Sequence, residues 1–196
     1  GAEYSVDDVE YVCPRHGYDG ILDVIYDYKR ISERITLRKL ADNPEHSIWR
    51  YFPLLPIDPS LLHMPKQAPR QGMVTTNLLS TVGWTPLYPA PRLAEQLAIR
   101  ELWIKDDSRN PTASLKDRAS AIAIIKARER GYGVITTAST GNAAAALAGL
   151  CAAVGQACVI FVPRTAPPAK IAQLLVYGAT VLLVDGTYDD AFELCL

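Results

Sequence analysis

From about residue 100 onward, short apolar runs alternate with longer stretches that are amphipathic or rich in alanine. The apolar and β-branched runs predict strands at 101–107, 133–139, 157–163 and 179–186. The longer stretches predict helices at 115–131, 141–155 and 167–178, with another helix beginning at 187–196. Strands that alternate with helices favour right-handed βαβ units. The pattern therefore predicts an α/β fold with a parallel sheet covered by helices on both faces.

Residues 1–80 follow a different pattern, with little periodicity and many prolines, above all in 53–72. Within them, 20–31 is typical of a strand or a short hairpin element, and 46–55 of a short amphipathic helix. We interpret 1–80 as an irregular N-terminal segment that wraps the core and 81–196 as the α/β region. Because the chain stops inside the last helical pattern, we expect an N-terminal fragment whose C-terminal part is missing.

Composition narrows the range of partners. A formal net charge of −1 gives no reason to expect nucleic acid or an anionic membrane surface. No apolar run is long enough to span a bilayer. Four widely spread cysteines, of which Cys151 and Cys158 lie in apolar segments, favour free thiols and a cytoplasmic setting.

The stretch Asn-Pro-Thr-Ala-Ser-Leu-Lys at 110–116 places Lys116 in the first turn of a predicted helix, after a turn and the cap residue Ser114. A cation is disfavoured there by the helix dipole, which suggests a chemical role. A lysine acts as nucleophile or base only when its amine is neutral, and nearby positive potential favours that form. The alternative is an ordinary lysine on the solvated surface.

A second stretch, Ser139–Asn142, follows the strand predicted at 133–139 and opens the next helix. Free backbone N–H groups at a helix start can hold a carboxylate or a phosphate. Because ligands bind at the carboxyl ends of parallel strands, we expect Lys116 and Ser139–Asn142 at the same rim of the sheet. The alternative for Ser139–Asn142 is a simple turn and cap.

Other polar residues allow simpler interpretations. Cys13 and His16 form a Cys-x-x-His pair, but a structural zinc site needs four ligands, so we predict no metal site. Asp106 and Asp107 are expected to end a strand and to orient the turn before Lys116. Asp117 suits the first turn of a helix. Arg118 either binds an anion or faces solvent, and the sequence leaves both open.

Three blocks of sequence resemble, in the same order, segments of the β-family (fold type II) of pyridoxal-phosphate enzymes, and most closely those of threonine synthases. These blocks are VGWTPLYPAPRL at 82–93, KDDSRNPTASLKDRAS at 105–120 and TTASTGNAAAALAGLCAAVG at 136–155. The N-terminal YVCPRHGYDG at 11–20 also resembles the cysteine-containing start of many threonine synthases. The resemblance implies the tryptophan synthase β-like fold and pyridoxal 5′-phosphate as cofactor.

The resemblance also implies roles for single residues. Lys116 would form the Schiff base with the cofactor and later shuttle protons. Asn142 would hydrogen-bond the pyridoxal 3′-oxygen. Ser139, Thr140 and Gly141 would cradle the substrate carboxylate. The implied reaction breaks a carbon–oxygen bond and converts O-phosphohomoserine and water to threonine and phosphate. The resemblance also makes a homodimer possible.

Departures from the family pattern loosen the assignment of substrate. Ala113 and Leu115 stand where many relatives have Gly and Phe, and Ala143 stands where threonine synthases often have Thr. The family's loop for the cofactor phosphate lies beyond Leu196. Threonine dehydratase, cysteate synthase and a cysteine synthase relative therefore remain alternatives. So does a non-catalytic module that lacks the cofactor-phosphate half.

Overall fold

A computed structural model describes residues 2–6, 8–9, 12–57 and 78–196. Contacts divide the chain into two compact units, Gly1–Ala41 and Asp42–Leu196. The boundary expected near residue 80 separates regions by sequence pattern, whereas this division separates them by contacts. Most of the proline-rich stretch 53–72 lies outside the described residues.

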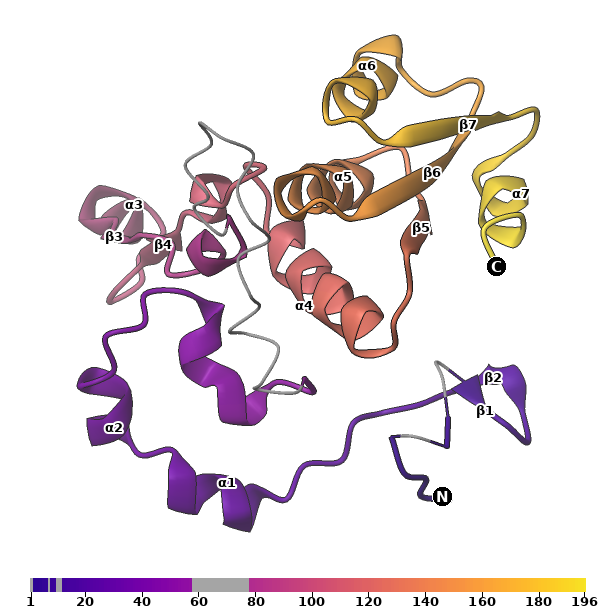
Figure 1. Cartoon of the computed structure of the whole chain (residues 1–196). Helices are drawn as coiled ribbons and strands as arrows, with labels where there is room; N and C mark the ends of the chain where they lie inside the picture. The colour runs from indigo at the N-terminus through magenta and orange to yellow at the C-terminus, as the bar shows by residue number, and fades with distance from the viewer. Residues whose placement is uncertain (1, 7, 10–11, 58–77) are drawn as a thin grey trace, which may run out of the picture. The chain divides into compact units, whose positions relative to one another are not determined.

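The first unit holds a small antiparallel hairpin and two short helices (Figure 1). Its elements are β1 Val12–Cys13, β2 Gly17–Ile21, α1 Tyr28–Arg34 and α2 Leu37–Ala41. The strand or hairpin expected at 20–31 is therefore wrong beyond Ile21. Asp27 accepts a hydrogen bond from the Arg30 N–H at 3.0 Å and so caps α1, which turns the second half of that stretch into a helix.

The second unit is built on a parallel sheet in the order β5-β6-β7, formed by Val134–Ala138, Ala157–Pro163 and Thr180–Val184. Val134 pairs with Ala157, and Val159 with Thr180. The connecting helices are α5 Asn142–Val154 and α6 Pro168–Val176, preceded by α4 Lys116–Glu129 and followed by α7 Tyr188–Glu193. The α/β fold with a parallel sheet is confirmed.

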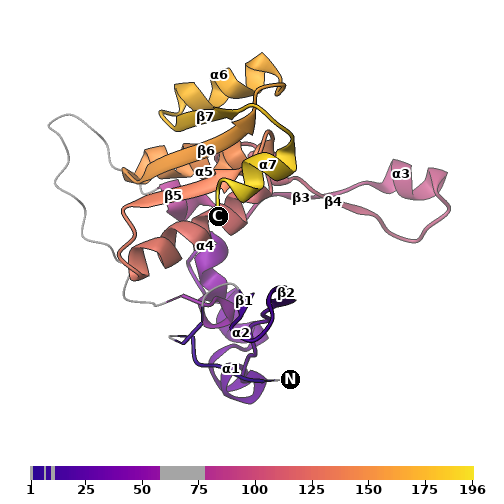
Figure 2. The ribbon, with the colours of Figure 1, turned by 90° about the vertical axis from the view of Figure 1, so that its right-hand side faces the viewer.

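Helices cover both faces of this sheet. Side chains alternate along β6, so Ile160 and Val162 join the cluster formed with α5 and α6, while Phe161 packs with Ala191 of α7. α4 packs on α5 from the same side. Figures 1 and 2 show α7 across the sheet from α5 and α6.

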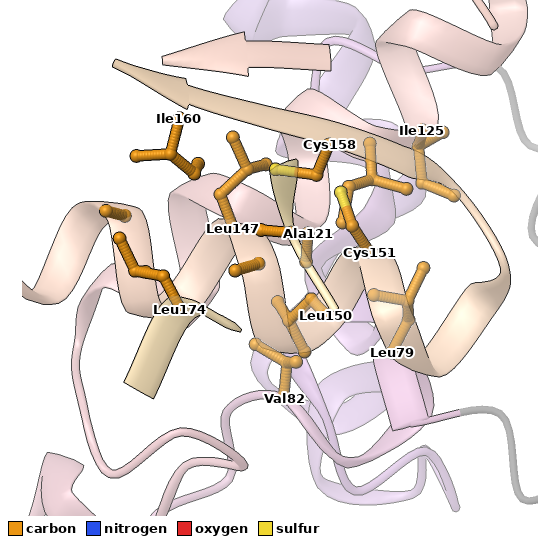
Figure 3. Packing of buried hydrophobic residues seen from close by; sticks show 14 of the residues in the cluster. Leu79, Val82, Ala121, Ile125, Leu147, Leu150, Cys151, Cys158, Ile160 and Leu174 are labelled. Atoms are coloured by element: carbon orange, nitrogen blue, oxygen red, sulfur yellow. The ribbon is translucent and has the colours of Figure 1, made fainter. Parts of the chain in front are cut away.

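The core centres on α5, whose alanine-rich sequence is buried as its pattern predicts (Figure 3). Leu150 and Cys151 are fully buried and pack with Ile160 of β6. Cys158 lies in the same cluster, which confirms that both cysteines behave as small apolar side chains. Gly155 ends α5 and Gly131 follows α4, both with positive φ, as expected of glycines at helix ends.

One strand differs from expectation. β4 Trp103–Lys105 does not join the parallel sheet but pairs antiparallel with β3 Leu87–Pro89. The helix α3 Pro91–Gln96 lies in the connection between these two strands. Lys116 therefore does not follow a strand of the parallel sheet. The apolar run 101–107 was compatible with either partner, because strand pairing depends on distant segments.

The described residues of the second unit also form the 3-10 helices η1 Ile48–Leu54, η3 Leu78–Thr81 and η4 Asp107–Arg109. The helix expected at 46–55 is thus confirmed as helical, with Pro53 inside it. Trp49 of η1 donates its indole N–H to the Leu79 carbonyl at 2.9 Å, which ties η1 to η3. No helix in the described part of the chain is long and apolar enough to cross a membrane.

Candidate functional site

The loop before α4 holds Lys116 on a well-ordered turn. The Ala113 N–H donates to the Asn110 carbonyl at 2.8 Å, and Ala113 has a positive φ of 59°. The Ser114 hydroxyl oxygen accepts the Lys116 N–H at 3.1 Å, but Ser114 lies one residue before Leu115, the N-cap position of α4, which has no side-chain capping bond. Lys116 is the first residue of α4, and its side chain is exposed.

Asp117, next to Lys116, is fully buried and bonds back to the loop. One carboxylate oxygen accepts the Thr112 N–H at 2.7 Å, and the other accepts the Thr112 hydroxyl. The interpretation of Asp117 as an acid favoured in the first turn of a helix is thus incomplete. Its main partner is Thr112, five residues earlier, so it locks the loop that leads to Lys116.

Arg118 binds the Asp107 carboxylate, which answers the question that the sequence left open. Arg118 Nη2 lies 2.9 Å from Asp107 Oδ1, and Nε lies 3.3 Å from Oδ2. Thr85 donates its hydroxyl proton to the same carboxylate at 2.6 Å. The Arg118 guanidinium beside Asp107 holds the pKa of that carboxyl below its usual value. Asp106, as expected, orients the turn by accepting the Ser108 N–H at 3.2 Å.

Asn110 ties the same loop to the segment around Gly83. Its side-chain oxygen accepts the Gly83 N–H at 2.9 Å, and its amide donates to the Asp107 carbonyl at 2.9 Å. Gly83 has a φ of +87°, and a Cβ there would lie 2.9 Å from the Ile48 nitrogen. Only glycine fits this position. Two of the three resembling blocks, 82–93 and 105–120, are therefore in direct contact.

The third block meets the lysine loop at α5. A Cβ on Gly149 would lie 2.7 Å from the Thr112 methyl carbon, so glycine allows the loop to pack directly on the helix. α4 and α5 also pack against each other. The two helices that start at Lys116 and at Asn142 are thus neighbours in one rigid framework.

The start of α5 is arranged differently. Gly141 precedes the helix, and no side chain among the described residues caps it. The Ser139 hydroxyl accepts the Gly141 N–H at 3.2 Å, which shapes the turn. Ser139 and Thr140 are half-buried and Asn142 is exposed. The first N–H groups of an α-helix have no partner inside the helix, so this end is suited to an anion.

These features fit pyridoxal phosphate as far as the described residues reach. The uncapped start of α5 matches an anionic or oxygen-bearing group, and the space where a Cβ of Gly141 would lie is open. Lys116 offers an exposed primary amine on a fixed backbone. Within the described chain no hydrogen bond or ion pair joins the Lys116 amine to Ser139–Asn142, so their shared role stays a prediction.

Sequence reasoning missed part of this network. The sequence predicted no individual role for Thr85 or Gly83. The Gly-Trp-Thr-Pro run was nevertheless a local signal of a constrained turn, because glycine and proline flank a hydroxyl there. Their contacts cross more than twenty residues of chain and could not be read from spacing. No group of three or more His, Cys, Asp or Glu side chains able to hold a metal is found in the part of the chain that the structure describes.

Comparison with known proteins agrees with these features. Residues 78–196 match the family model described as pyridoxal-phosphate dependent enzyme. The chain is 40% identical over 195 residues to a threonine synthase of Methanosarcina acetivorans, covering 99% of this chain and 43% of that protein. It is 35% identical over 195 residues to a threonine synthase of Methanocaldococcus jannaschii, covering 99% of this chain and 44% of that protein. The chain thus spans less than half the length of these relatives.

Solved structures give the same family. A pyridoxal 5′-phosphate-dependent aspartate racemase aligns with a TM-score of 0.52 and 32% identity, over 57% of this chain and 35% of that one. An O-acetylserine sulfhydrylase of Entamoeba histolytica aligns with a TM-score of 0.55 and 26% identity, over 65% of this chain and 41% of that one. With its parallel sheet, the lysine at the start of α4 and the uncapped start of α5, the chain belongs to the family of pyridoxal-phosphate-dependent enzymes of fold type II.

Proposed function

We propose that this chain carries the lysine-bearing part of a threonine synthase-type enzyme, which converts O-phosphohomoserine and water to threonine and phosphate in threonine biosynthesis. The observation that carries the proposal is the placement of Lys116. Its amine is exposed, and the contacts of the next two residues, Asp117 and Arg118, fix its backbone. The similarity to two threonine synthases over almost the whole of this chain supports the choice of reaction.

Lys116 would bind the cofactor and then act as general base. Pyridoxal phosphate, when bound, supplies an electron sink for charge that develops on the substrate carbon. The freed amine would take the proton from the α carbon and then from the β carbon of the substrate. The contacts of Asp117 with Thr112 and of Arg118 with Asp107 keep the base of this side chain in place while the amine moves.

The start of α5 would bind the anionic and oxygen-bearing groups. Ser139, Thr140 and Gly141, with the N–H groups at the start of α5, would cradle the substrate carboxylate. Asn142 would donate its side-chain amide to the pyridoxal oxygen. Because Gly141 carries no side chain and nothing lies within 4 Å of where its Cβ would be, a ligand can approach the backbone closely here.

The first test is trapping of the lysine. The 196-residue protein is mixed with pyridoxal phosphate, reduced with borohydride and mapped by peptide mass. We expect a pyridoxyl adduct concentrated on Lys116 and lost in Lys116→Arg. Lys126→Arg serves as the matched control, because Lys126 lies on the same helix and pairs with Glu129.

Labelling that is absent or scattered over surface lysines would count against the proposed role of Lys116. It would instead support a non-catalytic module that keeps the sheet without the chemistry. The same experiment is then repeated on the product of the complete reading frame, and failure there would end the enzyme hypothesis.

The substrate is tested separately on that complete protein. Release of phosphate from O-phosphohomoserine would support threonine synthesis. Formation of 2-oxobutyrate from threonine would support a threonine dehydratase, and activity with sulfur nucleophiles a cysteate or cysteine synthase. Cytoplasmic location and a homodimer are further parts of the proposal, to be checked by fractionation and by light scattering.

A further inference from the structure

Trp84 precedes the lysine loop, residues 107–116, by some twenty positions and has an unfavourable backbone conformation. Its φ is 49°, in the left-handed region that a bulky side chain rarely adopts. Such strain persists only where the surrounding structure holds it in place, and strained residues are concentrated at functional sites. The contacts of Trp84 and of its two neighbours therefore show what holds this conformation.

Both neighbours of Trp84 are bonded to the lysine loop. The Gly83 N–H donates to the side-chain oxygen of Asn110 at 2.9 Å. On the other side of Trp84, the buried Thr85 donates its hydroxyl proton to Asp107 at 2.6 Å. The turn 83–85 is thus attached to the loop on both sides of Trp84. A rotation about the backbone of Trp84 would disturb both hydrogen bonds together.

The indole ring of Trp84 is held by the segment 46–50. The His46 ring stacks on the indole with 4.8 Å between the ring centroids and 13° between the planes. The guanidinium carbon of Arg50 lies 4.0 Å from the indole centroid, which is the geometry of a cation–π contact. Arg50 is buried, whereas Trp84 is half-exposed. Because cation–π contacts are stronger for a cation shielded from water, this contact fixes a ring that its own burial does not fix.

The helix η1 gives this stack a firm base. The Ile48 N–H donates to the Val82 carbonyl at 2.8 Å. Ile48, Trp49 and Val82 are all buried in the main hydrophobic cluster. The ring of Trp84 therefore joins a helix that is anchored in the core to the turn that bonds the lysine loop.

We propose that Trp84 is a positioning residue for Lys116. The stacked ring keeps the turn 83–85 in its strained conformation, and the turn keeps Asp107 and Asn110 in place, and with them the backbone before Lys116. A ring that served packing alone would not require an unfavourable backbone, whereas strain that is retained indicates a geometric requirement. The inference rests on the proposed function, because it assigns Trp84 to the reaction of Lys116.

The first readout is hydrogen exchange in the 196-residue protein, which requires no cofactor. In Trp84→Ala, the amides of residues 110–116 should exchange faster by on the order of 10-fold, the factor expected when one cation–π contact is lost from a local opening equilibrium. Amides of the core helix α5 should change less. Trp84→Phe keeps an aromatic ring on Arg50 and should recover most of the protection.

Trp103→Ala is the matched control for loss of an indole ring. Trp103 is 53% exposed, against 51% for Trp84, and lies in β4, where it pairs with Pro89. Exchange of residues 110–116 should be unchanged in this variant. A rise as large as that in Trp84→Ala would mean that the loop responds to any loss of an indole and would overturn the inference.

The second readout is the yield of the pyridoxyl adduct on Lys116 at limiting pyridoxal phosphate. The yield should fall several-fold in Trp84→Ala, because a loop that opens more often presents the amine less precisely. It should be largely restored in Trp84→Phe and remain at the wild-type level in Trp103→Ala.

The positioning role and the proposed function fail in different ways. Absence of the adduct in the wild-type protein would count against the proposed function, while hydrogen exchange would still decide whether Trp84 braces the loop. An adduct that forms in the wild type and is unchanged in Trp84→Ala would overturn the positioning role alone. Exchange of residues 110–116 that rises no more than that of α5 would overturn it as well, because the ring would then serve only overall stability.

Discussion

The loops before α4 and α5 lead into two neighbouring helices, but the polar groups of the two loops differ in how many hydrogen bonds they make. Around Lys116, the polar groups of Thr112, Ser114, Asp117 and Arg118 bond to one another or to nearby segments. Around Asn142, the side-chain hydrogen bond found among the described residues is the one from the Gly141 N–H to Ser139. In the first loop, the polar groups have hydrogen-bond partners within the protein. At the start of α5, backbone N–H donors remain for a ligand.

This difference matches the roles proposed for the two loops. A lysine that forms a covalent bond with a cofactor and then transfers a proton needs a fixed backbone, because small displacements of a reacting group lower the reaction rate by large factors. A site that binds an anion needs donors without protein partners. Substitutions in the first loop should therefore lower stability, whereas substitutions in the second should lower binding.

The largest effect is expected from Asp117→Ala. The change leaves the partly buried N–H and hydroxyl of Thr112 without their acceptor, so the free energy of unfolding should fall by about 2–3 kcal/mol. Urea denaturation followed by circular dichroism measures this loss. Glu193→Ala, on the exposed side of α7, provides a neutral control. A loss below about 1 kcal/mol would mean that the loop is not held by Asp117.

Gly83→Ala should rank second. A Cβ on Gly83 would lie 2.9 Å from the Ile48 nitrogen, and the φ of +87° is unfavourable for alanine, so we expect a loss of about 2 kcal/mol. Thermal denaturation of the variant measures it. Gly133→Ala is the matched control: a Cβ at Gly133 meets nothing within 4 Å, and it should leave the melting temperature nearly unchanged. Equal effects of the two changes would contradict the close packing at Gly83.

Arg118→Ala should cost about 1–2 kcal/mol, because it removes a two-point ion pair that is still partly open to solvent. The loss should also depend on pH. The folded-state pKa of Asp107 is lowered, so the pair contributes stability above the unfolded-state pKa of the carboxyl. That contribution disappears as pH falls through the lower folded-state pKa.

The pH dependence gives this prediction its control. Urea denaturation at pH 7 and in acid should show the difference between wild type and Arg118→Ala shrinking below about pH 4. Arg100→Ala, whose side chain is almost fully exposed, should show little difference at either pH. A difference that stays constant into strong acid would exclude the ion pair as its source.

The smallest effect on stability is expected from Ser139→Ala. Loss of the hydrogen bond to the Gly141 N–H should lower the free energy of unfolding by no more than about 1 kcal/mol. The yield of the pyridoxyl adduct on Lys116 should nevertheless fall at limiting cofactor, because the turn that presents the start of α5 is less ordered. A larger loss of stability with an unchanged adduct yield would mean that the loop around Ser139 serves stability and not binding.

Local signals predicted much of the fold. The helices α4, α5 and α6 and the strands β5, β6 and β7 were expected at nearly their observed positions, because apolar periodicity and glycine at helix ends act over neighbouring residues. The helix α1 was mistaken for a strand because its cap, Asp27, is a single side chain inside an apolar run. The partner of β4 was wrong because pairing is decided by segments far along the chain.

The site divides in the same way. By itself the sequence determined where helices begin, and so placed Lys116 and Asn142 at two helix starts, since caps and turns use only nearby residues. The tertiary structure decided what Arg118 binds, that Asp117 is buried, and that Gly83 and Thr85 brace the lysine loop. Those contacts join residues up to 33 positions apart. They form only when burial and packing of the whole unit repay the entropy of closing such loops.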